Sequence, residues 1–217
     1  EVVLFDEPTT NVEVNAKLQL IRAFKEVTRR LSQTIVYVTH DQTEAMTLAD
    51  EIALMDKGRI LQREPPRSLY GNPRTEFGGW FLGNPGMNFC PGSIRAGKLA
   101  AALLPGGMVA LDRLPDGEVT LGIRPEALRL HAGPASGSVA ATVVARTITI
   151  GGRYLVKLRV GEAEIKAKVA PGPELAPGAV VHVECPPEQV TIFRDGRSCG
   201  RLAESEGILP KVSANAL

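Results

Sequence analysis

The first part of the chain contains apolar runs that no polar residue interrupts. Residues 2–5 form one such run, and residues 35–38 form a second run of β-branched and aromatic residues. Runs of this kind are typical of strands buried on both faces, as in a parallel sheet. Between them, one helical stripe is apolar and contains Leu18, Leu20, Ile21, Phe24, Val27 and Leu31. The pattern therefore predicts two neighbouring parallel strands joined by a crossover helix.

Shorter elements are predicted next. Residues 52–55 and 59–62 flank the stretch 56–58, which ends in glycine and predicts a β-hairpin turn. Two prolines at 65–66 precede a short helix. A further helix is expected over residues 75–82, with its aromatic side chains facing inward: Phe77, Trp80 and Phe81.

The pattern changes near residue 83, beyond which glycine and proline are frequent. Short alternating runs then recur about every ten residues, which is typical of a small barrel or sandwich. The candidate strands are residues 118–123, 139–150, 154–160, 163–169, 180–184 and 190–193. The fold class is therefore predicted as α/β plus all-β. We expect one domain over residues 1–83, a second over 84–201, and a poorly ordered tail over 202–217.

Composition and charge exclude several classes of function. The chain has 217 residues, 44% hydrophobic and 23% charged, which is ordinary for a soluble globular protein. A formal net charge of +1 gives no electrostatic footprint for nucleic acid, so no nucleic-acid partner is expected. No apolar run is long enough to span a bilayer, and the three cysteines lack CxxC spacing. The chain opens without methionine and inside a predicted strand, so we expect a piece of a longer protein.

Candidate chemistry lies where the two apolar strands end. Asp6 and Glu7 follow the first strand, and His40 follows the second. Ligands of open α/β folds bind at the carboxyl ends of strands. Asp6 is suited to hold Mg²⁺ through water, Glu7 to orient or deprotonate an attacking water, and His40 to contact both a γ-phosphate and Glu7. The structural alternative is that carboxylates and a lone histidine end strands there only because loops are solvated.

These residues belong to longer motifs. Residues 2–8 resemble the Walker B motif of ABC-type ATPases, and residues 39–42 resemble the switch-histidine loop. Residues 44–50 and 55–60 extend the resemblance to the ATP-binding subunits of carbohydrate importers of the maltose and glycerol-3-phosphate type. In the second part, Gly122-Ile123-Arg124-Pro125-Glu126 resembles the signature of the transport-associated OB domain, and Gly86-Met87-Asn88-Phe89 resembles its beginning. The implied fold is the C-terminal part of a P-loop ATPase domain followed by an OB-like regulatory barrel.

The resemblance implies ATP hydrolysis with ATP and Mg²⁺ as cofactors. It gives Glu7 the role of polarising water, His40 that of bridging the γ-phosphate to Glu7, and Asp6 that of holding Mg²⁺ through water. Residues 9–13 correspond to the D-loop, where Glu13 stands in place of the usual Asp and is assigned to the nucleotide site. The implied partners are an identical or paired ATPase subunit, membrane permease subunits and, indirectly, an external solute-binding protein. The implied location is the cytoplasmic face of the cell membrane, with uptake of a carbohydrate or polyol as the purpose.

One required part is missing from the sequence. The phosphate-binding pattern GxxxxGK[ST] does not occur in these 217 residues, and neither do the family's glutamine loop and signature motif. We therefore expect the chain alone not to hydrolyse ATP.

Two other functions stay open. ABC ATPases that act on DNA share both loops but carry coiled-coil insertions and no OB domain, so the strand-rich second part disfavours them. A non-enzymatic regulatory or dimerisation module would describe the chain expressed alone. An oligonucleotide-binding OB barrel is disfavoured because aromatic residues make up only 5% of the chain, and Arg124 is expected to hold the turn at Pro125 rather than a ligand.

Overall fold

The computed structural model describes residues 2–10, 12–111, 114–149, 151–170 and 175–205. Its contacts divide the chain into two compact units, residues 1–73 and 74–217. The division falls before residue 83 because residues 74–76 hydrogen-bond within the second unit. Glu76 N donates to Gly196 O (3.0 Å), and Ser198 N donates to Arg74 O (2.9 Å).

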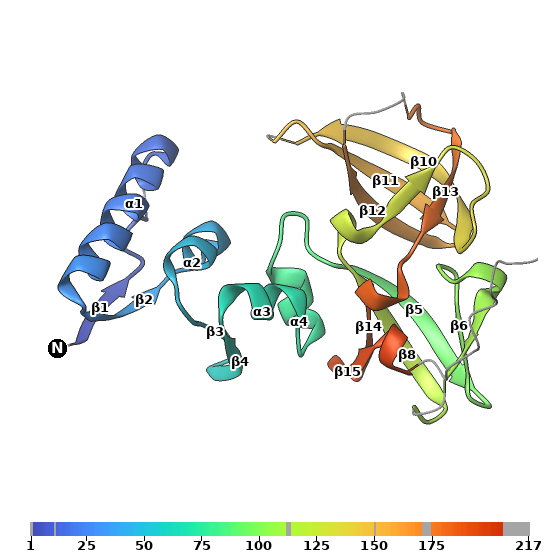
Figure 1. The fold of residues 1–217 in the computed structure, drawn as a ribbon, viewed down its shortest axis with the longest axis horizontal. Coiled ribbons are helices and arrows are strands. Elements are labelled where there is room, and N and C mark those ends of the chain that lie inside the picture. The colour runs from blue at the N-terminus through green and yellow to red at the C-terminus, as the bar shows by residue number, and fades with distance from the viewer. Residues whose placement is uncertain (1, 11, 112–113, 150, 171–174, 206–217) are drawn as a thin grey trace, which may run out of the picture. The chain divides into compact units, whose positions relative to one another are not determined.

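The first unit begins with a strand–helix–strand arrangement (Figure 1). Strand β1 (Val2–Asp6) pairs in parallel with β2 (Thr34–Val38), and helix α1 (Val14–Leu31) connects them. The rings of Phe5, Phe24 and Tyr37 pack together, with centroids 4.9–6.3 Å apart, so α1 covers the sheet face that carries Phe5 and Tyr37. This confirms the predicted pair of parallel strands with a crossover helix.

The expectation that both faces of these strands are buried was wrong for this chain. Side chains alternate between the faces of a strand, and α1 covers only one face. The other face exposes four apolar residues: Val2 (68% exposed), Leu4 (67%), Val36 (48%) and Val38 (46%). The apolar runs therefore indicate strands whose two faces are both apolar. Within the described residues, only the face under α1 is covered.

The remainder of the first unit is short. Helix α2 (Gln42–Leu48) precedes the antiparallel hairpin of β3 (Ile52–Asp56) and β4 (Arg59–Glu64), and α3 (Pro66–Gly71) follows. The two-residue turn has positive φ at both Lys57 (47°) and Gly58 (74°), as a primed hairpin turn requires. The hairpin predicted at this glycine is confirmed.

The second unit is built from antiparallel strands in two sheets (Figure 1). The six-stranded sheet has the order β15 (Arg197–Arg201), β14 (Val190–Arg194), β8 (Gly117–Ile123), β5 (Asn88–Arg95), β6 (Lys98–Ala101), β7 (Met108–Ala110). The five-stranded sheet has the order β12 (Ala163–Val169), β11 (Tyr154–Val160), β10 (Ser138–Ile148), β13 (Val180–Glu184), β9 (Arg129–His131). Short helical pieces complete the unit: α4 (Glu76–Phe81), η1 (Pro105–Gly107), η2 (Pro125–Ala127), η3 (Pro187–Gln189) and α5 (Leu202–Ser205).

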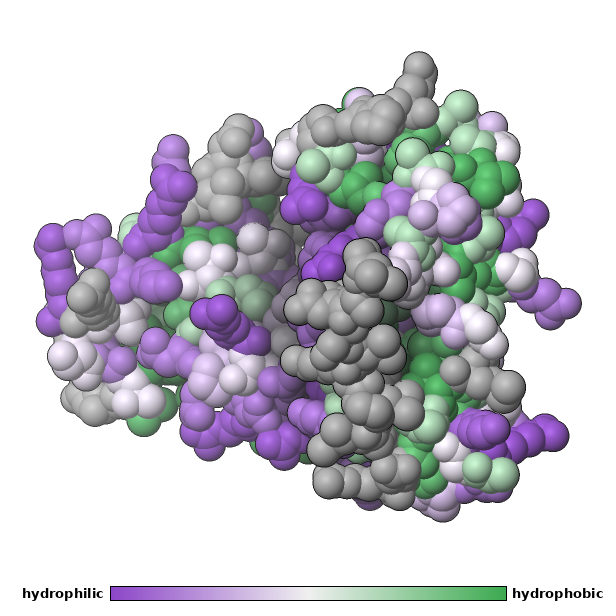
Figure 2. All heavy atoms as spheres, turned by 45° about the vertical axis from the view of Figure 1, so that its right-hand side comes forward, coloured by the Kyte–Doolittle hydropathy of each residue, from purple (hydrophilic) through white to green (hydrophobic). Residues whose placement is uncertain are grey.

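One hydrophobic core joins the two sheets. Its most buried members include Ile94 and Ile192 from the first sheet and Val156, Leu158 and Val183 from the second, each 0% exposed. A curled, all-antiparallel β unit after a parallel α/β unit confirms the predicted fold class. The face drawn in Figure 2 mixes hydrophilic and hydrophobic residues in both parts of the chain, in line with its ordinary composition.

Five strands of the second unit were not predicted from the sequence: β5, β6, β7, β9 and β15. The longest of these, β5, contains Pro91 and Gly92, and β15 contains Gly200, residues that ordinarily argue against a strand. The prediction of a poorly ordered tail over residues 202–217 was wrong for residues 202–205, which form α5 and include the fully buried Leu202. Residues 206–217 lie outside the described residues.

Two predictions about the start of the second unit need correction. Trp80 on α4 is 61% exposed and lies beside the stacked rings of Phe77 and Phe81, so it does not face inward. Arg124 is structural, as expected, but its side chain also holds α4, which the sequence did not predict. Its buried Nη1 donates to the carbonyls of Gly79 (2.7 Å) and Leu82, near the C-terminal end of that helix.

Candidate functional site

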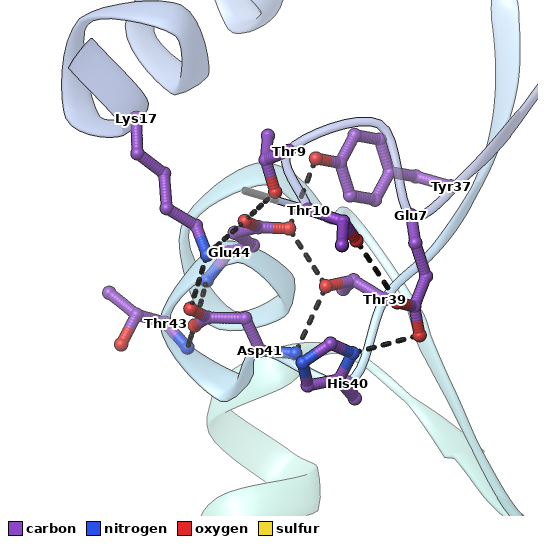
Figure 3. Close-up of polar contacts among 10 residues, drawn as sticks. All are labelled: Glu7, Thr9, Thr10, Lys17, Tyr37, Thr39, His40, Asp41, Thr43 and Glu44. Atoms are coloured by element: carbon purple, nitrogen blue, oxygen red, sulfur yellow. Dashed lines mark hydrogen bonds and ion pairs between the residues drawn. The ribbon is translucent and has the colours of Figure 1, made fainter. Parts of the chain in front are cut away.

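The parallel pairing brings the ends of β1 and β2 to the same edge of the sheet. The last register pair is Asp6 with Val38, and Glu7 N donates to Val38 O at 2.9 Å. His40 Nδ1 then lies 2.8 Å from Glu7 Oε1, although the two residues are 33 positions apart (Figure 3). The expectation that this acid and this imidazole meet at one sheet edge is confirmed.

Glu7 leaves the strand in an unusual conformation. Its φ of 43° lies in the left-handed region, which costs a non-glycine residue about 1–2 kcal/mol. Strained backbone of this kind gathers at functional sites, where neighbouring contacts maintain it. Here a tight turn maintains it, because Thr10 N donates to Glu7 O (3.1 Å) and Thr10 Oγ1 donates to Glu7 Oε2 (3.1 Å).

The contact between Glu7 and His40 changes the pKa values of the two side chains in opposite directions. The hydrogen bond from the His40 ring, helped by the Thr10 hydroxyl, lowers the pKa of Glu7 below its usual value. The same hydrogen bond and the negative charge of Glu7 raise the pKa of His40. Glu7 therefore stays ionised while His40 is more readily protonated. The His40 side chain is 74% exposed, so the rest of its ring is accessible to a ligand.

The loop after β2 is shaped by Asp41, the N-cap of α2. Its Oδ1 accepts from the backbone N–H groups of Thr43 (2.7 Å) and Glu44 (3.2 Å), and its Oδ2 lies 2.7 Å from Lys17 Nζ. Partial burial opposes the charged form, but Lys17 and the two amides outweigh it and lower the pKa of Asp41. This cap fixes the beginning of α2 at Gln42, two residues after His40.

The sequence did not predict the buried carboxylate of Glu44, which lies in the helix that follows His40. Glu44 on α2 is 0% exposed, and four side chains reach it: Thr9, Lys17, Tyr37 and Thr39 (Figure 3). The only available signal is the capping pattern Asp41-x-x-Glu44, which places Glu44 in the first helical turn. Its burial depends on α1 bringing Lys17 across from another part of the chain, which no local pattern reveals.

The two other predicted site residues, Asp6 and Glu13, are not the residues that form the Glu7–His40 contact. Asp6 is the last residue of β1 and is exposed, on the strand face opposite Phe5. Glu13 is exposed at the N-cap position of α1. No group of three or more His, Cys, Asp or Glu side chains within the described residues could hold a metal ion. A single carboxylate such as Asp6 still fits Mg²⁺, which is commonly held by one or two carboxylates together with phosphates and waters.

Comparisons with known proteins identify the family. The TOBE domain family matches residues 121–193, and the MalK OB fold domain family matches residues 83–128. The chain is 46% identical over 146 residues to the sn-glycerol-3-phosphate import ATP-binding protein UgpC of Chromohalobacter salexigens, covering 66% of this chain and 38% of that protein. It is 35% identical over 204 residues to the sulfoquinovosyl glycerol transport ATP-binding protein SmoE of Agrobacterium fabrum, covering 89% and 55%. The chain belongs to the ATP-binding subunits of ABC importers.

A third member of this importer family extends the match along the chain. The UgpC protein of Ruegeria sp. is 35% identical over 209 residues, covering 94% of this chain and 57% of that protein. The chain thus spans about half the length of the curated relatives it matches. The resemblance carried by the Walker B, switch-histidine and OB-domain motifs is confirmed. In the described part of the chain, the structure has no helix with the length and apolar character needed to cross a membrane.

Proposed function

We propose that this chain supplies the water-activating end of an ATPase site in an ABC importer that takes up a carbohydrate or polyol. The observation that supports this is the 2.8 Å contact between Glu7 and His40 at the sheet edge. The names of two relatives, an sn-glycerol-3-phosphate import protein and a sulfoquinovosyl glycerol transport protein, favour a glycerol-containing solute.

The proposed chemistry divides the work among three side chains. Bound Mg²⁺–ATP would supply the γ-phosphate and part of the charge that stabilises its transfer to water. Asp6 would hold the metal through a water molecule, and Glu7, kept ionised by His40, would orient the attacking water and accept its proton. Because Nδ1 of His40 contacts Glu7, its Nε2 would be the ring nitrogen that contacts a γ-phosphate oxygen. A positioned base of this kind contributes about 10²–10⁴-fold to the rate.

The proposal extends to the domains and partners. The first unit, residues 1–73, would form the ATPase part, and the second unit would form the OB-like regulatory part. Glu13 would lie in the D-loop that reaches a second ATPase subunit, identical or paired. Membrane permease subunits would hold the protein at the cytoplasmic face of the membrane, and an external solute-binding protein would act through them.

The test is the substitution Glu7→Gln in the complete importer ATPase. It keeps the shape of the side chain but removes the basic oxygen, so we expect ATP binding to persist and turnover to fall by about 10²-fold or more. Glu51→Gln is the matched control, because Glu51 is an exposed glutamate of the same unit paired with Arg63. Undiminished hydrolysis by the Glu7 variant would remove Glu7 from the role of base.

A further inference from the structure

The Glu44 carboxylate connects four separate places in the first unit. Its Oε1 accepts from Thr9 Oγ1 and lies 2.7 Å from Lys17 Nζ. Its Oε2 accepts from Tyr37 OH (3.0 Å) and Thr39 Oγ1 (2.8 Å). These donors come from the segment after β1, from α1, from β2 and from the loop after β2, respectively (Figure 3). A fully buried carboxylate is tolerated only when donors of this kind satisfy both oxygens.

The loop that carries His40 is held on both sides by these contacts. Thr39 donates its hydroxyl hydrogen to Glu44 and accepts from Asp41 N at 3.0 Å. Asp41 is held by Lys17, whose ammonium group also contacts Glu44. His40 itself is mostly exposed, so its ring position depends on the backbone that these neighbours fix.

The segment that carries Glu7 is held by the same carboxylate. Thr9, two residues after Glu7, is only 4% exposed, and its hydroxyl is directed at Glu44. Thr10 donates to the Glu7 carboxylate directly. The turn at residues 7–10 is therefore joined to the Glu7 side chain through Thr10 and to Glu44 through Thr9. Glu44 therefore contacts both loops whose ends meet in the Glu7–His40 hydrogen bond.

We propose that Glu44 is a positioning residue that sets the Glu7–His40 contact by fastening both loops. It touches neither reacting group, and it acts through Thr9 and Thr39. Its charged state supports the role. Burial disfavours the charge of Glu44, but the hydrogen bonds from Lys17, Thr9, Thr39 and Tyr37 outweigh burial and lower its pKa. The consequence for turnover rests on the proposed function, whereas the consequence for the His40 ring does not.

The test is Glu44→Gln in the full chain, read by the NMR titration of His40. An amide cannot accept from all four donors, so the loops lose at least part of their anchor. We expect the pKa of His40 to fall from its raised value toward the value in Glu7→Gln, where the contact is absent. The charged groups facing His40 are Glu7, Lys17 and Asp41, and all three are retained in the variant. Glu51→Gln is the control and should leave the titration unchanged.

A milder pair of variants keeps the test decisive if Glu44→Gln unfolds the first unit. Thr39→Val removes the hydroxyl that donates to Glu44, while Thr39→Ser retains it. We expect the valine variant to lower the pKa of His40 and the serine variant to preserve it. A folded Glu44→Gln protein with the His40 titration of the original chain, or equal titrations for the two Thr39 variants, would overturn the proposal.

Turnover in the complete importer ATPase separates this inference from the proposed function. Glu44→Gln should lower kcat by about 10–100-fold with little change in the KM for ATP, as expected for misplaced reacting groups. If Glu7→Gln leaves hydrolysis intact, the proposed function fails while the His40 titration still decides the role of Glu44. If Glu7→Gln abolishes hydrolysis and Glu44→Gln changes neither kcat nor the titration, the role assigned to Glu44 fails alone.

Discussion

Glu7 and His40 form an exposed ion pair that contributes little to the stability of the fold. Exposed ion pairs contribute little to folding because water screens them, so the strained φ of Glu7 is not offset by the pair alone. The tight turn with Thr10 and the backbone bond to Val38 fix the conformation instead. The conformation of Glu7 thus depends on contacts that a substitution of His40 leaves in place.

The Glu7–His40 contact is expected to exist within a pH window. The pKa of His40 is raised by Glu7, so the ionic form of the contact is present below the folded pKa of His40 and is lost as pH rises through that value. The pKa of Glu7 is lowered, so the contact is lost again as pH falls through that lower value. NMR titration of His40 should therefore give a pKa above the ordinary value of about 6.5.

The control for this window is Glu7→Gln, which removes the charge that raises the pKa of His40. The pKa of His40 in that variant should fall toward its ordinary value. An unchanged His40 pKa after this substitution would contradict the contact seen at the sheet edge.

At the scale of elements, the sequence predicted the features that follow from local hydrophobic pattern and from the short connection between the two strands. The two apolar runs and the helical stripe between them predicted that Glu7 and His40 would meet, because short crossovers place consecutive parallel strands side by side. The Glu44 contacts could not be predicted in this way, since they require Lys17 from α1 to reach α2. Strand β5 was missed because Pro91 interrupts its pattern. Pro91 pairs with Thr120 of β8, and the pairing of β5 with β6 begins only after it, at Gly92.

The segment that follows α4 is packed so closely that only glycine fits at residue 86. A Cβ at Gly86 would meet the backbone of Trp80, with its carbonyl carbon at 3.0 Å and its Cα at 3.1 Å. Backbone atoms cannot turn away as a side chain can, so Gly86→Ala should destabilise the chain by about 1–3 kcal/mol. The measurement is urea unfolding followed by circular dichroism.

Gly133→Ala is the matched control for Gly86. It lies in the same unit, and a Cβ there meets nothing within 4 Å. A Gly86 variant as stable as the Gly133 variant would mean that the segment after α4 can move away from Trp80 without cost.

At the scale of the whole molecule, the chain combines the sheet edge that carries Glu7 and His40 with an OB-type unit, and its sequence contains no phosphate-binding loop pattern. That loop normally supplies the backbone N–H groups and the lysine that hold the phosphates. Glu7 and Asp6 are carboxylates, which repel phosphate oxygens unless a metal or other cation lies between them. His40 is the partner of Glu7 and carries at most one positive charge, which is too little to hold a triphosphate.

We therefore expect this 217-residue chain to bind Mg²⁺–ATP no more tightly than the millimolar range and to show no hydrolysis. Isothermal titration and phosphate release would measure both, with the complete UgpC protein of Chromohalobacter salexigens as the positive control. The raised pKa of His40 in the same sample would show that the sheet edge is formed, so that weak binding reflects the missing phosphate contacts. Micromolar, magnesium-dependent binding would contradict this expectation, because it would require a phosphate site within these residues.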